Sequence, residues 1–292
     1  MWVSPDKFRV GNIDVTAISD GKLALKPEGL FKDVPREEWQ AEVKELDANG
    51  NVVVGMNSLV FRSAGKLILL DTGLGDKPST VNATGSASGS PELSLLIKRL
   101  ERHGIRREDI DVVINTHAHP DHIGWNTHLE NGDLVPTFPN AKYWMTKSEW
   151  DFYTQPRRME RYQYLAENLK PILDRGQFEL ADGETDVTPE VRIIPSPGHT
   201  IGHACIMIHS AQEVAMFLGD LMHHPAHLEH PEWVNAVDYL PQQTPESRRH
   251  LIREAYRNDA VLVACHSSYS GFGRIVNENG SNRYVRLDPP SS

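Results

Sequence analysis

The sequence has few of the features that mark secreted, membrane-bound or disulfide-stabilised proteins. Its 292 residues include two cysteines, Cys205 and Cys265, which are too few for a disulfide framework and fit a reducing compartment. The longest apolar runs, such as Leu67–Leu70 and Ala260–Cys265, are far shorter than the ~20 residues of a membrane span. At the N-terminus, no basic segment precedes an apolar one, so no secretory signal is visible. These absences predict a cytoplasmic protein with no membrane contact.

Positive charge is also scarce. The chain has 30 Lys and Arg residues against 40 Asp and Glu residues, and its net charge is −10 with neutral histidines. Nucleic-acid backbones and anionic membrane surfaces select basic patches, so neither is an expected partner. The length and the lack of a convincing linker favour one domain over residues 1–292. Histidine, in contrast, is abundant, with 14 residues whose placement is informative.

Apolar runs and turn residues alternate along the chain in a pattern that predicts an α/β fold. The runs Lys66–Leu70, Asp111–Asn115 and Val261–Ala264 are expected to be buried strands, because each is short, apolar and followed by polar residues. A helix is expected from Pro91 to Gly104, with leucines on one face. The segment Arg157–Leu173 also has apolar residues at helical spacing.

The strongest functional signal is an HxHxDH motif made of His117, His119, Asp121 and His122. It directly follows the strand expected at Asp111–Asn115, where α/β sheets place their chemistry. Four donors within six residues cannot all reach one tetrahedral ion without strain, but two neighbouring ions can share them. Imidazole and carboxylate suit zinc and similar divalent ions. A histidine-rich surface loop is the alternative, and the position after a buried strand disfavours it.

Three later residues could complete a two-metal site, namely His199, Asp220 and His266. Each follows a short apolar run that is expected to be a strand, so all three should meet at the same sheet edge. Alone, His199 would more often be structural and Asp220 a turn residue. A buried carboxylate at a strand end needs a compensating charge, however, and a dication would supply it.

These residues and the Leu70-Asp71-Thr72-Gly73 segment occur in the order found in the metallo-β-lactamase superfamily, which the chain resembles over nearly its whole length. The resemblance implies an α/β fold, an αββα sandwich of two mixed β-sheets flanked by helices, with a binuclear site at one edge. It places Asp71 beside the site as a residue that orients ligands. It also implies two ligand sets joined by a bridge: His117, His119 and His199 for one metal, Asp121, His122 and His266 for the other, and Asp220 between them.

This sequence differs from several branches of the superfamily, and these differences limit which branch it resembles. The β-lactamases of the superfamily lack a bridging residue like Asp220, and flavodiiron proteins carry Glu where this chain has His119. The acidic charge counts against the nucleases, and the stretch after His266 is too short for the helical domain of glyoxalase II. What remains is similar to the branch of N-acyl-homoserine lactonases and methyl parathion hydrolase-like enzymes, above all in Pro197-Gly198-His199-Thr200 and Gly219-Asp220-Leu221-Met222-His223.

The resemblance implies a dinuclear hydrolase that takes a small ester or lactone substrate and holds two divalent ions, with zinc expected. A water bridging the ions would be acidified to a hydroxide nucleophile. Asp121 and His223 are the expected catalytic residues, and His223 stands where family lactonases often have Tyr. Its imidazole could protonate the departing oxygen. Cys265 could suggest a thiol nucleophile, but a cysteine at a buried strand end more often fills space.

Three alternatives stay open at this stage. A lactonase or carboxylic-ester hydrolase leads, and a phosphotriesterase or arylesterase of the methyl parathion hydrolase type follows. A non-catalytic ligand-binding member of the fold is disfavoured, because all seven expected ligands are present. A homodimer is left open.

The sequence defines the substrate pocket less well. Four aromatic residues near the ligands in sequence could form an apolar wall: Trp125, Trp233, Tyr239 and Phe272. Most of the histidines after Asp220 are expected at the surface rather than in a third metal site: His223, His224, His227 and His230. The segments Asn82–Ser90 and Arg157–Leu173 could each form a lid or a solvated face.

Overall fold

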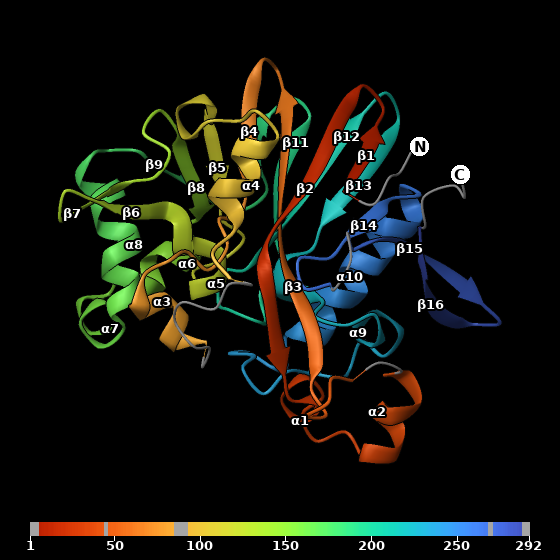
Figure 1. Cartoon of the computed structure of the whole chain (residues 1–292). Coiled ribbons are helices and arrows are strands. Elements are labelled where there is room, and N and C mark those ends of the chain that lie inside the picture. Colours follow the sequence, from red (N-terminus) through yellow and green to blue (C-terminus); the bar gives the residue numbers. More distant parts are fainter. Residues whose placement is uncertain (1–5, 44–45, 85–92, 268–270, 288–292) are drawn as a thin grey trace.

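The structure, a computed structural model, describes residues 6–43, 46–84, 93–267 and 271–287. Within that part of the chain, two seven-stranded sheets pack face to face and helices cover their outer faces (Figure 1). Each sheet contains both parallel and antiparallel pairs. This is the αββα sandwich of two mixed sheets that the sequence resemblance implies.

The first sheet has the strand order β1-β2-β3-β4-β5-β8-β9. Its strands are β1 (Lys7–Val10), β2 (Ile13–Leu25), β3 (Val52–Ser63), β4 (Lys66–Leu70), β5 (Val112–Ile114), β8 (Lys142–Thr146) and β9 (Phe178–Ala181). The pairs from β4 to β9 are parallel, and the pairs from β1 to β4 are antiparallel. All three residues of β5 are buried, because β5 lies between two parallel neighbours and both of its faces are covered.

The second sheet has the strand order β10-β11-β12-β13-β14-β15-β16. Its strands are β10 (Thr185–Thr188), β11 (Val191–Pro195), β12 (Ala204–Ser210), β13 (Glu213–Phe217), β14 (Val261–Val263), β15 (Phe272–Glu278) and β16 (Ser281–Arg286). Its one parallel pair in the described residues joins β13 to β14. A small separate hairpin consists of β6 (Thr127–Glu130) and β7 (Asp133–Pro136).

The main core lies between the two sheets. It is built by apolar residues from both, including Leu59 and Ile114 of the first sheet and Ile206 and Val263 of the second. Two further clusters join each sheet to its outer helices: one connects the second sheet to α10 (Thr244–Arg257), and the other connects the first sheet to α4 (Leu96–Arg102). The two halves of the sandwich therefore share one buried interior.

The remaining helices are shorter or cover the edges. They are α1 (Pro27–Leu30), α2 (Arg36–Glu42), α3 (Pro78–Ala83), α5 (Pro120–Ile123), α6 (Lys147–Tyr153), α7 (Pro156–Arg161), α8 (Gln163–Asp174) and α9 (Ala226–Glu229), with 3₁₀ turns η1 (Arg107–Asp109), η2 (Gly124–Asn126) and η3 (Gly219–Leu221). No helix in the described ranges combines the length and the apolar character that crossing a bilayer requires.

Two sequence predictions of secondary structure need correction, and a third falls mostly outside the described residues. The helix expected from Pro91 begins at Leu96, because Ser94 has φ +60 and interrupts any earlier turn; Pro91 itself lies outside the described residues. The segment Arg157–Leu173 forms two helices, α7 and α8, divided at the extended residue Tyr162. Of the segment 82–90, the first two residues end α3, and 85–90 lie outside the described residues.

Two loops must approach closely to build the edge that carries the HxHxDH motif. Gly124 follows α5, and its backbone nitrogen donates to the carbonyl of Gly73, 2.8 Å away. A Cβ on Gly124 would lie 1.9 Å from the carbonyl oxygen of Leu74, so no larger residue fits without a backbone shift. Glycine is required there by space rather than by backbone angle.

We therefore expect Gly124→Ala to reduce the free energy of unfolding by about 1–3 kcal/mol, the usual scale for overpacking. Chemical denaturation measures this loss. The matched control is Gly29→Ala, since a Cβ on Gly29 meets nothing within 4 Å and should change stability by less than about 0.5 kcal/mol. Equal effects of the two substitutions would contradict the close approach.

Candidate metal centre

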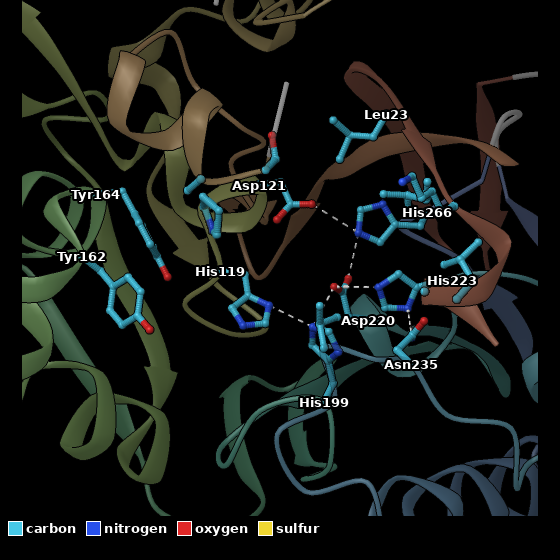
Figure 2. A pocket seen from close by; sticks show the side chains of 18 residues that line it. Leu23, His119, Asp121, Tyr162, Tyr164, His199, Asp220, His223, Asn235 and His266 are labelled. Atoms are coloured by element: carbon cyan, nitrogen blue, oxygen red, sulfur yellow. Dashed lines mark hydrogen bonds and ion pairs between the residues drawn. The ribbon is translucent and has the colours of Figure 1, made fainter. Parts of the chain in front are cut away.

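The seven residues that the sequence marks as ligands meet at one edge of the sandwich. His117 and His119 lie in the loop after β5, and α5 carries Asp121 and His122 into the same region. Pro120 starts this one-turn helix, where its missing N–H is no loss. The other three follow strands of the second sheet: His199 after β11, Asp220 in η3 after β13, and His266 after β14. Figure 2 shows five of the seven around a common centre.

The Asp220 carboxylate lies between two sets of imidazoles. Its Oδ2 is 3.0 Å from His199 Nε2 and 3.6 Å from His117 Nε2, and His199 Nε2 is 2.9 Å from His119 Nδ1. Its Oδ1 is 2.9 Å from His122 Nε2 and 3.0 Å from His266 Nε2. One carboxylate oxygen thus faces each set.

Asp121 joins the second set. Its Oδ2 is 3.5 Å from His266 Nε2 and 3.8 Å from His122 Nε2. With 13% of its side chain exposed against 4% for Asp220, it is the more accessible of the two carboxylates. We call His117, His119 and His199 the first cluster, and Asp121, His122 and His266 the second cluster; Asp220 adjoins both.

The clusters fit bound cations. His117 Nε2, His122 Nε2 and Asp220 Oδ1 are buried, and although they lie close to one another or to other ligand atoms, none makes a hydrogen bond among the described residues. An unsatisfied buried polar atom costs roughly 1–3 kcal/mol, so three at one centre call for a ligand that accepts their lone pairs. In each of two groups, His117-His119-His199-Asp220 and His122-Asp220-Cys265-His266, the donor atoms lie within 4.8 Å of one another. The donor set therefore indicates a dinuclear divalent metal site.

The outer nitrogens of the second-cluster histidines are held by hydrogen bonds. His122 Nδ1 lies 2.8 Å from Asp71 Oδ2, which confirms Asp71 as the orienting residue that the resemblance implies. His266 Nδ1 lies 2.8 Å from the carbonyl oxygen of Gly55 in β3. A Cβ on Gly55 would lie 2.1 Å from the carbonyl of Ser267, so glycine permits this approach. These bonds turn Nε2 of each ring toward Asp220.

The first cluster has corresponding partners that the sequence did not reveal. His199 Nδ1 lies 2.9 Å from Asp238 Oδ1, and His119 Nε2 lies 3.3 Å from the hydroxyl of Tyr153. Asp238 is far from the motif in sequence, and Tyr153 ends α6. No spacing rule links either residue to its histidine, so only the packed fold identifies them.

Burial and neighbouring charges shift the pKa values of the ligand residues in opposite directions. Burial lowers the pKa of His117 well below its usual value and that of His119 to about 3, so both rings are neutral, the form that binds metal. Burial alone would raise the pKa of Asp220, but His122, His266 and the other imidazoles around it hold that pKa well below its usual value. Burial opposes protonation of His122 as well, yet Asp220 and Asp71 raise its pKa far above normal. The carboxylates therefore draw positive charge into the centre.

Cys265 lies beside the second cluster but also belongs to the core between the sheets. Burial raises the pKa of its thiol to about 12, which keeps it protonated and a poor nucleophile at neutral pH. Cys205 is buried too, and burial raises its pKa to about 12. Both observations agree with cysteines that fill space.

The expectation that the histidines after Asp220 lie at the surface is wrong for two of them. His223 and His227 are buried, whereas His224 is half-buried and His230 borders on exposed. His227 Nδ1 accepts from the backbone nitrogens of His223 and His224, and its Nε2 lies 3.0 Å from the carbonyl of Leu30. His227 therefore organises the backbone of this segment. His223 instead faces the centre, with Nε2 3.1 Å from Asp220 Oδ2.

A pocket of about 470 Å³ opens onto both clusters. Aliphatic side chains line one side, and Tyr162 and Tyr164 of the α7–α8 junction line the other (Figure 2). The apolar lining residues are Leu23, Leu25, Leu30, Val237, Tyr162 and Tyr164. Ala83 and Thr84 at the end of α3 also line it. Parts of both segments that the sequence marks as candidate lids thus border the pocket.

The predicted aromatic wall is wrong. Trp125 is buried with its Nε1 bonded to Asp20, and Phe272 lies in the core between the sheets. Trp233 packs against Phe31 and His230, outside the pocket lining. Tyr239 is 49% exposed and packs on Phe152. Proximity in sequence did not give proximity to the pocket: Trp125, Trp233 and Phe272 are buried in packing elsewhere, and Tyr239 lies at the surface.

Comparisons with known proteins agree with this geometry. Residues 52–266 match the family model described as the metallo-beta-lactamase superfamily. The N-acyl homoserine lactonase AiiA of Bacillus thuringiensis subsp. kurstaki is 26% identical over 161 residues, which is 52% of this chain and 57% of that protein. The chain thus spans little more than half the length of this relative. A probable metallo-hydrolase of Mycobacterium bovis is 25% identical over 267 residues, covering 85% of this chain and 81% of that protein.

Solved structures show the same fold. AidC, a dizinc quorum-quenching lactonase solved with a product, superposes with a TM-score of 0.82 at 23% identity and covers 98% of both chains. The hydrolase AbOPH superposes with a TM-score of 0.80 at 23% identity, covering 98% of this chain and 99% of that one. At this level of identity the likeness concerns the fold.

We expect protein prepared without added metal to contain about two divalent ions per chain, with zinc favoured by the ligand types. Asp220→Asn should weaken the binding of both ions together, because each Asp220 oxygen faces a different cluster. Elemental analysis before and after dialysis against chelator measures both effects. One tightly held ion, unchanged by Asp220→Asn, would rule out a shared carboxylate.

Proposed function

This chain belongs to the metallo-β-lactamase superfamily, and we propose that it is a metal-dependent hydrolase that cleaves the ester bond of small lactones and related carboxylic esters. The observation that carries the proposal is a carboxylate shared by two histidine clusters at the floor of an apolar pocket. Similarity to lactonases supports the choice of an ester bond. The core shared by both sheets supports one domain as the working unit.

The residues divide into two ligand sets in this proposal. His117, His119, His199 and Asp220 Oδ2 would hold one ion, and Asp121, His122, His266 and Asp220 Oδ1 the other. Dications held by these two sets, with zinc as the expected metal, would supply the Lewis acidity that polarises a carbonyl and lowers the pKa of a water. Asp121, the more exposed carboxylate, can accept a hydrogen bond from that water while it holds the second cluster together.

His223 is suited to donate a proton to the departing oxygen. The side-chain amide nitrogen of Asn235 lies 2.9 Å from His223 Nδ1, and an amide nitrogen can only donate. His223 Nδ1 therefore accepts, and the ring proton resides on Nε2. That nitrogen is 3.1 Å from Asp220 Oδ2 and borders the pocket (Figure 2). The ring stacks on His266 with centroids 4.9 Å apart and an interplanar angle of 17°, which fixes its plane.

The pocket lining favours a substrate with an apolar substituent. Leu23 and Leu30 are buried at its wall, and Val237 is 64% exposed at its lining. Tyr164 is buried and Tyr162 half-exposed on the opposite side. An acyl chain or aromatic ring that enters between these walls removes apolar surface from water, worth about 25 cal/mol per Å². A strongly charged substituent would gain no such free energy.

An arylesterase or phosphotriesterase is the second candidate. The observation that favours it is His223 at a position where the sequence resemblance associates lactonases with Tyr. The two tyrosines, Tyr162 and Tyr164, also offer ring faces to an aromatic leaving group. A non-catalytic binding protein of this fold would retain the pocket but show no turnover.

We expect turnover of lactones with apolar acyl groups, at rates above those for aryl esters and phosphotriesters, when the purified protein is assayed against one panel of all three classes. Chelator should abolish the activity, and added divalent metal should restore it. A rate for phosphotriesters above that for every lactone would reverse the two candidates. No turnover of any class by metal-loaded protein would favour the binding protein.

His223→Ala should reduce kcat by roughly 10²-fold for substrates with alkoxide leaving groups, the usual scale for a general acid, with metal content intact. The reduction should be smaller for esters with phenolic leaving groups, which need little protonation. Steady-state kinetics on a matched alkyl and phenyl ester pair, with metal analysis of each sample, measures the difference. Equal small reductions for both esters would remove His223 from the reaction.

A further inference from the structure

Glu149 is a fully buried carboxylate on α6 that the ligand sets do not include. A carboxylate in an apolar interior is costly unless hydrogen bonds or a counter-charge compensate it. No ion pair between Glu149 and a Lys, Arg or His side chain occurs in the part of the chain that the structure describes. Its compensation comes from three hydrogen-bond donors, and all three belong to loops that carry first-cluster histidines.

Each Glu149 oxygen holds a different loop. Oε1 accepts from the backbone nitrogen of Ala118, 2.8 Å away, and Ala118 lies between His117 and His119. Oε2 accepts from the Thr200 hydroxyl at 2.8 Å and from the Gly202 nitrogen at 2.9 Å, in the loop that carries His199. One side chain therefore ties the loop after β5, in the first sheet, to the loop after β11, in the second.

The packing around Glu149 leaves this link little freedom. The Thr146 hydroxyl accepts from the Glu149 nitrogen at 3.2 Å and donates to the Gly202 carbonyl at 2.5 Å. A Cβ on Gly202 would lie 2.2 Å from the Glu149 nitrogen, so the loop lies directly on the first turn of α6. With Thr200 and Ala118 also fully buried, water has no access to replace these bonds.

The second cluster is held by a different acid. Asp71 accepts from the Thr116 nitrogen at 2.7 Å and contacts His122 Nδ1 at 2.8 Å. Among the described residues, Glu149 makes no hydrogen bond to the segments that carry Asp220 and His266. Asp71 therefore contacts a second-cluster ligand directly and also holds the residue before His117, whereas Glu149 bonds the loops that carry the first cluster.

We propose that Glu149 is a positioning residue for the first cluster, which sets the separation of His117 and His119 from His199 across the two sheets. This inference rests on the proposed two-metal centre. Its consequence is selectivity: loss of the Glu149 link weakens the ion of the first cluster and leaves the ion of the second cluster in place.

The test is the stepwise release of zinc from the loaded, full-length protein to a chromophoric chelator. In Glu149→Gln, the amide group must point a donor at the N–H of either Ala118 or Gly202, so at least one bond becomes a repulsion. We expect the affinity of one ion to decrease 10- to 100-fold, the usual effect of losing a residue that orients metal ligands. His119→Ala identifies the release step of the first cluster, and His266→Ala identifies that of the second.

Three further variants distinguish a loss of positioning from a general loss of structure. Asp20→Asn alters another fully buried acid, which accepts from the nitrogens of Leu74 and Leu96; it should reduce the melting temperature without changing the first-cluster step. Thr200→Val removes one of the three bonds to Glu149, and Thr200→Ser retains it. If Glu149→Gln does not fold, this pair supplies the test: Thr200→Val should bind the first-cluster ion more weakly and release it more readily, and Thr200→Ser should release it as the wild type does.

The outcomes separate this inference from the proposed function. Two ions in the wild type with unchanged release from Glu149→Gln, or with both ions weakened equally, would overturn the positioning role alone. Fewer than two ions in the wild type would overturn the metal centre on which the inference rests. A selective loss that matches His119→Ala would establish the role.

Discussion

The buried carboxylate of Asp220 is the constraint on which the rest of the site depends. Its two oxygens face histidines that follow three different strands: His117 and His122 come after β5 of the first sheet, and His199 and His266 come after β11 and β14 of the second. A carboxylate surrounded by imidazoles and excluded from water is stable only if positive charge comes to it. This need for positive charge links the fold to the chemistry. The sandwich brings the strand ends to one edge, and the buried carboxylate placed there favours the binding of cations.

The residues around the ligands fix the orientation of the histidine rings. Asp71, Asp238 and the carbonyl of Gly55 occupy the outer nitrogens of three histidines, which directs the inner nitrogens to the centre. Glu149 acts one layer further out, on the backbone that carries the first cluster. A hydrolytic centre that must hold ions within tenths of an ångström needs such layers, since ligand side chains alone rotate freely.

The sequence alone predicts the parts of the site that are local. His117, His119, Asp121 and His122 follow a buried strand at fixed spacing, so their convergence could be inferred, and His199, Asp220 and His266 follow short apolar runs in the same way. The resemblance to a known family supplied the αββα architecture and the order of the ligands, and the structure confirms that architecture.

The pocket and the supporting residues could not be predicted, because tertiary packing creates them. Glu149 and Asp238 meet their partners only when elements distant in sequence pack together. Trp125 and Phe272 were misassigned, because an aromatic ring next to a ligand in sequence is needed more often for the core than for the pocket. Tyr162 lines the pocket because the chain is extended there, between two helices that the sequence pattern shows as one.

Anomalous diffraction at the zinc edge, from crystals of the zinc-loaded protein, tests whether one carboxylate joins two metal positions. If Asp220 joins both positions, the anomalous map should contain two peaks of similar height roughly 3.5–4 Å apart, the spacing of two-metal hydrolytic sites. One peak should lie beside each oxygen of Asp220. A single peak, or two peaks of which only one contacts Asp220, would contradict it.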